Sequence, residues 1–184
     1  MSSFPSPLEG RLVRLRAREP QDEAAFHAWF NDYAVTEFLA IRYPVSHLAE
    51  RSMLDSEPAL RHERAAFSVE TLGDGVLIGN CELRVPAPEN RCGNVGIAIG
   101  HTGYRDRGYG TDAMRTLCRF GFTMMNLHRI ELTVDATNAR AHHVYRKVGF
   151  VEEGLLRDHR FISGAYRDTV VMSILRNEFQ EDPL

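Results

Sequence analysis

The segment Arg105-Asp-Arg-Gly108-Tyr-Gly110-Thr-Asp-Ala113 decides how the rest of the chain is interpreted. It follows the apolar, β-branched run Val95-Gly-Ile-Ala-Ile99 and opens a helical pattern over residues 112–125. The first N–H groups of a helix have no partner inside the helix, and glycines let such a backbone approach a ligand closely. The helix dipole adds about half a positive charge at this end. A strand, a glycine-rich turn with two arginines and a helix therefore predict a phosphate site.

Several glycine-rich phosphate motifs can be compared with this segment. No Lys-Ser/Thr pair follows the second glycine, so a nucleoside-triphosphate P-loop is excluded. Gly108–Ala113 satisfies the dinucleotide fingerprint G-x-G-x-x-G/A, and Asp135 stands about where a ribose-binding acid would be. However, the first glycine trails Ile99 by a long, charged connection, and no repeated strand–helix pattern follows Asp135. A dinucleotide-dependent enzyme is therefore the weaker alternative.

Length and composition limit the classes of protein that fit. The chain has 184 residues, which is enough for one domain with one sizeable core. The net charge of −3 argues against a broad nucleic-acid surface. No apolar run approaches the roughly 18 residues of a membrane span, and the N-terminus lacks the basic and apolar regions of a signal peptide. We therefore expect a cytoplasmic protein that binds neither nucleic acid nor membrane.

The cysteines and histidines predict no metal site. Cys81, Cys92 and Cys118 are odd in number and lack C-x-x-C spacing, so they give neither a disulfide framework nor a zinc site. Reduced thiols also suit the cytoplasm. The eight histidines lack ligand spacing, and the adjacent His142 and His143 would point to different faces of a helix.

Hydrophobic periodicity predicts one mixed domain. Alternating apolar residues and apolar runs predict strands over 11–16, 66–71, 76–84, 94–99, 128–134, 150–155 and 167–174. Helical spacing predicts helices over 22–30, 47–60, 112–125 and 138–147. Hairpins around one strand–helix–strand unit predict an α/β fold with three layers around a mixed sheet. We expect residues 1–8 and 179–184 to be tails and residues 9–178 to form the domain.

Motifs along nearly the whole chain resemble those of the GNAT superfamily of acetyl-CoA-dependent N-acetyltransferases. The spacing Arg105-x-x-Gly108-x-Gly110 resembles the [Gln/Arg]-x-x-Gly-x-[Gly/Ala] signature of that superfamily. The spacing Asn138-x-x-Ala141-x-x-x-Tyr145-x-x-x-Gly149-Phe150 resembles its downstream motif. Further segments resemble the RimJ/RimL-type branch, which includes ribosomal-protein N-terminal acetyltransferases and is close to spermidine acetyltransferases. These segments are 10–16 with Asp22, 29–32, 76–79, 152–157 and 164–175.

The resemblance implies a GNAT-type fold, in which a mixed central β-sheet with splayed parallel strands has helices on both faces. The splayed strands would be 94–100 and 129–134. It also implies that acetyl-CoA is the co-substrate, with its pantetheine arm beside Ala98, Ile99 and Gly100 and its thioester in the gap between the strands. The residues expected to hold the pyrophosphate and the adjoining part of the cofactor are Arg105, Arg107, Gly108, Tyr109, Gly110, Thr111 and Asn138. Asn138 also fits the N-cap of the helix that follows it.

The resemblance implies that Tyr145 is the general acid, which would protonate or hydrogen-bond the departing thiolate. By position alone, on an apolar helical stripe, Tyr145 would instead be a core tyrosine. Glu82 is a candidate general base if burial raises its pKa, although it equally fits a solvent-facing strand position. His101 and a water chain are alternatives. The expected reaction is direct attack by an amine in a ternary complex. A non-catalytic acyl-CoA-binding module is the alternative to an enzyme, and the presence of Tyr145 favours the enzyme.

The acceptor is expected to be a primary amine, with the α-amine of a peptide or protein favoured over a polyamine or an aminoglycoside. Its pocket is predicted between residues 29–42 and the hairpin at 160–166, where Tyr33, Glu37 and Phe38 are the candidate lining residues. Tyr33 and Phe38 equally fit the core. An open groove would favour a peptide and a closed acidic pocket a polyamine. The resemblance also suggests a homodimer.

Overall fold

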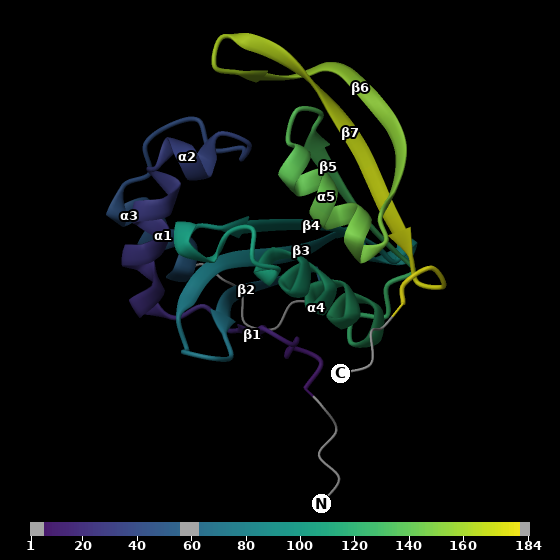
Figure 1. Cartoon of the computed structure of the whole chain (residues 1–184), viewed down its shortest axis with the longest axis horizontal. Coiled ribbons are helices and arrows are strands. Elements are labelled where there is room, and N and C mark those ends of the chain that lie inside the picture. Colours follow the sequence, from purple (N-terminus) through teal and green to yellow (C-terminus); the bar gives the residue numbers. More distant parts are fainter. Residues whose placement is uncertain (1–5, 56–62, 181–184) are drawn as a thin grey trace, which may run out of the picture.

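The computed structural model describes residues 6–55 and 63–180 and arranges them around one seven-stranded sheet (Figure 1). The strand order is β1-β2-β3-β4-β5-β7-β6. Neighbouring strands are antiparallel except β4 and β5, which are parallel, so the predicted mixed sheet is confirmed. The strands are β1 (Val13–Arg16), β2 (Arg64–Thr71), β3 (Leu77–Ala87), β4 (Cys92–Ile99), β5 (Arg129–Asp135), β6 (Val151–Ile162) and β7 (Ala165–Leu175).

Helices cover both faces of this sheet. They are α1 (Glu23–Phe30), α2 (Tyr33–Thr36), α3 (His47–Asp55), α4 (Tyr109–Thr123) and α5 (Ala139–Val148), with short 3-10 turns at η1 (Pro20–Asp22), η2 (Pro88–Asn90) and η3 (Thr102–Tyr104). Phe67 of β2 packs edge-on against Phe120 of α4, with ring centroids 5.2 Å apart. The next residue, Ser68, donates its hydroxyl to Asp22, just before α1, at 2.6 Å. Successive strand residues point to opposite faces, so α4 and α1 lie on opposite sides.

The main hydrophobic core lies between the sheet and α4. The apolar stripe expected from helical spacing is buried at Met114, Leu117, Cys118 and Gly121, whereas Met124, just past the last residue of α4, is 61% exposed. Leu8 and Phe179 also pack against this core, so the packed region extends one residue beyond each end of the predicted range 9–178.

Two predicted boundaries differ from the structure for identifiable physical reasons. The helix predicted over 112–125 begins at Tyr109, because Gly108 and not a polar side chain forms its N-cap. The strand predicted over 150–155 continues to Ile162 as β6. This strand lies at the edge of the sheet and is exposed along nearly all its length, so alternation of apolar residues cannot reveal where it ends. The helix predicted over 47–60 forms α3, and its last residues, 56–60, lie outside the described part of the chain.

The parallel pair separates soon after it begins. β4 and β5 pair only as Cys92 with Arg129, Gly93 with Ile130 and Asn94 with Glu131. Residues 95–99 of β4 continue to pair with β3 on their other side, while residues 132–135 of β5 pair with β7. Figure 1 shows β5 turning away from β4 beyond the shared segment. The predicted splay is therefore confirmed, and it leaves one edge of β4 open.

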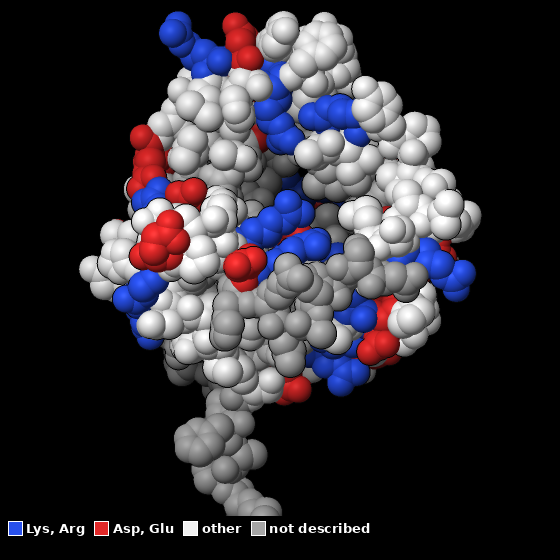
Figure 2. All heavy atoms as spheres, turned by 180° about the vertical axis from the view of Figure 1, so that it is seen from behind, with Lys and Arg blue, Asp and Glu red and all other residues white. Residues whose placement is uncertain are grey.

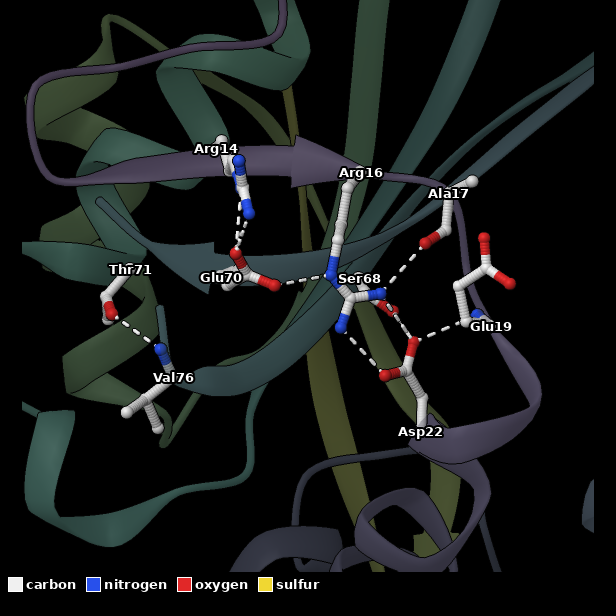
Figure 3. A network of polar contacts seen from close by, with 9 residues as sticks. All are labelled: Arg14, Arg16, Ala17, Glu19, Asp22, Ser68, Glu70, Thr71 and Val76. Carbon is white, nitrogen blue, oxygen red and sulfur yellow. Dashed lines mark hydrogen bonds and ion pairs between the residues drawn. The ribbon is translucent and has the colours of Figure 1, made fainter. Parts of the chain in front are cut away.

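A polar network fastens the start of α1 to the sheet (Figure 3). Arg16 of β1 pairs with Asp22 at 2.8 Å and with Glu70 of β2 at 2.6 Å, and Arg14 also pairs with Glu70. Burial raises the pKa of Asp22, but the hydrogen bonds from Arg16 and Ser68 outweigh burial and hold that pKa below its usual value. The network therefore fixes α1, and the segment that follows it, relative to β1 and β2.

Candidate active site

The turn before α4 carries a run of free backbone N–H groups. Gly108 has φ +89°, which a glycine adopts without strain, and Asp106 has φ +57°. The N–H groups of residues 106–111 donate to no acceptor in residues 6–55 and 63–180. The N–H of Arg105 is different because it donates to the carbonyl oxygen of Thr102 at 3.2 Å. The anion cradle thus begins one residue later than the sequence predicted.

Arg105 ties this cradle to two other elements. Its Nε donates to the carbonyl oxygen of Ile99 at 3.1 Å, at the end of β4. Its Nη1 donates to the carbonyl oxygen of Ala34 in α2 at 3.3 Å. The guanidinium therefore brings positive charge to the cradle while holding β4, α2 and the turn together. A direct bond from Arg105 to a phosphate stays a prediction.

Two more arginines lie at the cradle. The Arg107 guanidinium lies 5.8 Å from the ring centroid of Tyr104 and 5.9 Å from that of Tyr109, within the range of cation–π attraction. Arg140, in the first turn of α5, places its Nε 3.1 Å from Oδ1 of Asp106. Sequence reasoning missed Arg140; the available signal was its position two residues after Asn138 in the downstream motif.

The end of β4 is shaped for close approach of a ligand backbone. Ile99 and Ala98 pair with Gly79 and Asn80 of β3, and neither has a β5 partner in the described part of the chain. A Cβ at Gly100 would lie 2.1 Å from the ring of Trp29, so the indole packs directly on this backbone. The predicted pantetheine site therefore has an open strand edge with the indole of α1 at its end.

Tyr145 of α5 is buried, with 9% of its surface exposed, and its ring centroid lies 5.8 Å from that of Phe150. Its hydroxyl has no hydrogen-bond partner among the residues that the structure describes, although buried tyrosine hydroxyls usually have one. Burial raises the pKa of Tyr145 to about 12. The phenol is therefore protonated at neutral pH and has a donor to offer.

Asn138 is the N-cap of α5, as predicted. Its Oδ1 accepts the N–H of Ala141 at 3.0 Å. Its amide nitrogen donates to no group in the described part of the chain, so it is available to a ligand. Both roles that the sequence allows for Asn138 are compatible with this geometry.

Glu82 lies on β3 opposite Gly96 of β4, on the face away from α4. Its carboxylate pairs with Arg64 at 3.0 Å and with Arg84 at 2.8 Å, and 26% of the side chain is exposed. The burial expected of a general base is thus only partial. For Glu82 to take a proton, an acceptor amine has to displace one guanidinium. The alternative base, His101, is exposed, and its Nδ1 accepts the N–H of Gly103 at 3.3 Å.

The short helix α2 contacts both the cradle and the β6–β7 turn. Besides the bond from its Ala34 to Arg105, the hydroxyl of Tyr33 lies 2.7 Å from that of Ser163 in the β6–β7 turn. The ring of Phe38, just after α2, lies 6.0 Å from the Arg167 guanidinium. Tyr33 is 61% exposed, and neither aromatic residue belongs to the main core. Tyr33 and Phe38 therefore contact the hairpin that was predicted as the opposite wall, and Glu37 lies between them in sequence.

The face opposite α4 is hollowed near its centre, and basic side chains gather around the hollow (Figure 2). Arg64 and Arg84 lie on this face beside Glu82. Since the strand partners Asp135 and Thr169 point away from the α4 core, Arg167, two residues from Thr169, lies on the same face.

Asp135 does not fit the role of a ribose-binding acid. It ends β5 with only 2% of its surface exposed, and its Oδ1 accepts both the N–H and the hydroxyl of Thr137, at 2.9 and 2.6 Å. A carboxylate engaged in this turn cannot reach a nucleotide. The dinucleotide alternative therefore loses its acidic residue.

The remaining candidate groups add little chemistry. Cys81, Cys92 and Cys118 are free thiols, and burial raises the pKa of Cys81 to about 12, which keeps it protonated. Within residues 6–55 and 63–180, no group of His, Cys, Asp and Glu could hold a metal ion. No helix in the same part of the chain is long and apolar enough to cross a membrane.

Comparison with known proteins identifies the family. Residues 12–151 match the acetyltransferase (GNAT) domain. The chain is 32% identical over 167 residues to spermidine N(1)-acetyltransferase of Escherichia coli K12, with 91% of this chain and 88% of that protein covered. This chain therefore belongs to the GNAT acetyltransferase family. It is an acetyl-CoA-dependent N-acetyltransferase.

Two solved structures with coenzyme A resemble the fold closely. Spermidine N-acetyltransferase from Vibrio cholerae, in complex with CoA and spermine, gives a TM-score of 0.78 at 28% identity, covering 90% of this chain and 96% of that one. Mycobacterium smegmatis RimJ, in complex with CoA-disulfide, gives a TM-score of 0.80 at 25% identity, covering 94% and 88%. The predicted fold class and co-substrate are thus confirmed.

Proposed function

We propose that this enzyme acetylates the α-amine of a peptide or protein N-terminus, as a RimJ/RimL-like member of the family. The observation that carries the proposal is the basic hollow on the face opposite α4 (Figure 2). Arg64 and Arg84 flank Glu82 on this face of the sheet, and Arg167 belongs to the hairpin wall. A basic wall repels a polyamine, which carries several positive charges, and attracts the carbonyl and carboxylate oxygens of a peptide.

In this proposal, backbone N–H groups and side chains bind different parts of acetyl-CoA. The free N–H groups of residues 106–111 hold the pyrophosphate, with Arg105 and Arg107 supplying charge. The pantetheine arm pairs with the open edge of β4 at Ala98, Ile99 and Gly100, and the amide of Asn138 donates to the cofactor. This arrangement places the thioester in the gap between β4 and β5.

The proposed chemistry is direct acyl transfer. The neutral amine attacks the thioester carbonyl carbon, a backbone N–H near Ile99 stabilises the oxyanion, and the C–S bond breaks as the thiolate leaves. Tyr145 donates its phenolic hydrogen to this thiolate. A phenol with a pKa of about 12 and a thiol with a pKa of about 8.5 differ by about 3.5 units, or about 5 kcal/mol, so Tyr145 acts by a hydrogen bond and not by complete transfer.

The amine proton needs a separate acceptor. Glu82 is our first candidate because it lies on the acceptor face, beside β4. His101, or a water chain that leads to either residue, is the alternative. Replacing Glu82 by Gln should lower kcat/KM most at low pH, whereas an unchanged pH profile would remove Glu82 from the mechanism.

A polyamine is the second candidate acceptor. It is favoured by the similarity to the spermidine acetyltransferases of Escherichia coli and Vibrio cholerae. The charge on the face opposite α4 argues against it, because that face carries Arg64, Arg84 and Arg167 against Glu82 and the buried Asp135.

A turnover screen tests the proposal. Release of coenzyme A is measured with peptides, spermidine and an aminoglycoside as acceptors. We expect the best peptide to exceed spermidine in kcat/KM, and Tyr145→Phe to lower kcat by about 100-fold while the Kd for CoA is unchanged. Tyr43→Phe is the matched control, because Tyr43 is 83% exposed. Faster turnover of spermidine than of every peptide would contradict the proposed acceptor, and full activity of Tyr145→Phe would contradict the proposed acid.

We further propose that residues 9–178 act as one domain, that the enzyme works in the cytoplasm, and that it forms a homodimer. The family resemblance supports the homodimer. Light scattering after size-exclusion chromatography measures the mass in solution, and a value of about one chain at micromolar concentration would contradict the dimer.

A further inference from the structure

We propose that Arg167 recognises the acceptor, by donating hydrogen bonds to the first carbonyl oxygen of the peptide whose α-amine is acetylated. Asp135 is the positioning residue that holds this guanidinium in place. The inference rests on the proposed acetylation of peptides and adds to it the residue that recognises the acceptor.

Arg167 has unused donors in an unusual place. Only 24% of its side chain is exposed, yet its guanidinium makes no hydrogen bond within residues 6–55 and 63–180. Its recorded contacts are the carboxylate of Asp135 at 3.8 Å and the ring of Phe38 at 6.0 Å. A guanidinium carries five N–H donors, and no nitrogen of Arg167 is among the buried polar atoms that lack a partner, so these donors are open to a ligand. The guanidinium of Arg167 therefore has N–H donors that a bound ligand can engage.

Asp135 explains why the guanidinium stays at this position. Its Oδ2 is buried and has no hydrogen-bond partner in the described part of the chain. The hydroxyl of Thr169, its strand partner on β7, is also buried and without a partner there. A buried carboxylate needs a compensating charge, which Arg167 provides. At 3.8 Å the pair attracts without forming a hydrogen bond, so all the donors of Arg167 stay available.

Phe38 fixes the orientation of the same group. A guanidinium over an aromatic face is held by cation–π attraction, which limits the planes that it can adopt. The segment around α2 thus contacts both sides of the splay, with Ala34 bonded to Arg105 and Phe38 under Arg167. Asp135 ends β5 and Ile99 ends β4, so Arg167 lies across the gap from the predicted thioester site.

The chemistry of Arg167 selects one class of acceptor. A peptide has a carbonyl oxygen two bonds from the carbon that bears its α-amine, and a guanidinium donates well to such an oxygen. A polyamine has no acceptor oxygen and carries additional positive charge. Arg167 should therefore favour peptides both by hydrogen bonding and by repulsion of the competing class.

The test is a thermodynamic cycle on acceptor binding, in which one change is made in the protein and one in the peptide. The full chain is saturated with CoA throughout. Calorimetry compares an alanine tetrapeptide amide with its analogue in which an (E)-alkene replaces the first peptide bond. We expect the wild-type protein to bind the true peptide at least about tenfold more tightly. Arg167→Met, which retains the stem over Phe38, should reduce this ratio to about one. Arg157→Met is the matched control, because Arg157 is exposed on the neighbouring strand β6 and should keep the wild-type ratio.

Asp135→Asn separates positioning from folding. It should lower the ratio for the two peptides while the Kd for CoA stays at the wild-type value. A change in thermal stability without any change in the ratio would show that Asp135 is only structural. An equal ratio in the wild type and Arg167→Met would overturn the inference.

Turnover distinguishes this failure from failure of the proposed function. A wild-type protein that acetylates spermidine but no peptide would overturn both the peptide acceptor and the role of Arg167. A wild-type protein that acetylates peptides with the same KM after Arg167→Met would overturn the role of Arg167 alone.

Discussion

The carboxylate of Asp112, in the first turn of α4, accepts the backbone N–H of Leu12 at 2.8 Å, across 100 residues of sequence. The same side chain accepts the N–H of Val13 at 3.0 Å and that of Arg11 at 3.1 Å. One carboxylate therefore attaches the start of β1 to the helix that begins at the anion cradle.

Removal of this carboxylate should destabilise the whole fold. Asp112→Ala leaves up to three N–H groups without their charged acceptor, so we expect the free energy of unfolding to fall by about 2–4 kcal/mol. Urea denaturation followed by circular dichroism measures the change. Glu89→Ala is the control, because Glu89 is exposed in η2. A loss no larger than that of the control would show that the three bonds contribute nothing net.

Trp29 should report the binding of coenzyme A. It is the single tryptophan of the chain and packs on Gly100, at the end of the predicted pantetheine site. A ligand that pairs with β4 alters the surroundings of the indole, so we expect its emission to change on titration with CoA and to saturate. Gly100→Ala should weaken binding at least about tenfold, since the new Cβ displaces the indole. Gly154→Ala is the matched control, because a Cβ at Gly154 would meet open space. Gly164→Ala cannot serve as a control, because Gly164 has φ +83°, where any side chain is strained.

Tyr145 should make stability depend on alkaline pH. Burial raises its pKa in the folded state to about 12 from the ordinary value of 10.0, so the folded protein retains the phenolic proton to higher pH than the unfolded chain. The stabilisation is present below pH 10 and is lost between about pH 10 and 12, at a cost of up to about 3 kcal/mol. The difference in unfolding free energy between the wild type and Tyr145→Phe should therefore shift in this window. A difference that does not vary with pH would contradict the raised pKa.

Glu50 of α3 should destabilise the protein at neutral pH. It is 3% exposed, and its Oε2 has no hydrogen-bond partner among the described residues. Burial raises the pKa of Glu50 above its ordinary value of 4.5 despite the nearby Arg18. Its contribution is therefore favourable below about pH 4.5 and is lost as the pH rises through the folded-state pKa. Glu50→Gln should raise Tm at pH 7.5 and leave it unchanged at pH 4. Glu89→Gln provides the exposed control, and an equal shift at both pH values would argue for a cause other than ionisation.

Local chemistry made much of the fold predictable from the sequence. The hydroxyl oxygen of Ser46 accepts the N–H of Ala49 at 3.1 Å and caps α3, which is typical of a serine just before a helical pattern. Gly149 adopts φ +113° just past α5, where a left-handed residue commonly ends a helix. The residues of the stripe that lie within α4, such as Met114, Leu117 and Cys118, are buried because their period matches one helical face. The splay of β4 and β5 came from the family resemblance, since no local pattern encodes it.

Contacts between segments that are far apart in the sequence could not be predicted from it. Asp112 fits a helix start by composition, and nothing around it indicates that it binds β1. Helix α2 has four residues, too few for a periodic pattern. Arg167 is one of several arginines near the end of the chain, and its importance appears only when Asp135 and Phe38 are seen beside it. Of the site residues named from the motifs, Tyr109, Gly110 and Thr111 lie in α4 and not in the turn before it, and the partners of the site residues were not predictable.

The short pairing of β4 with β5 has a consequence for the mechanics of the protein. Within the described chain, the sheet joins its first four strands to its last three only through three residue pairs. Within the sheet, only this short pairing resists twisting of one group of strands against the other. A pantetheine arm in the gap would connect the two groups at a second place, so hydrogen exchange at the amides of residues 95–99 should slow when coenzyme A is present. Pulling the two groups of strands apart by force should then require more work.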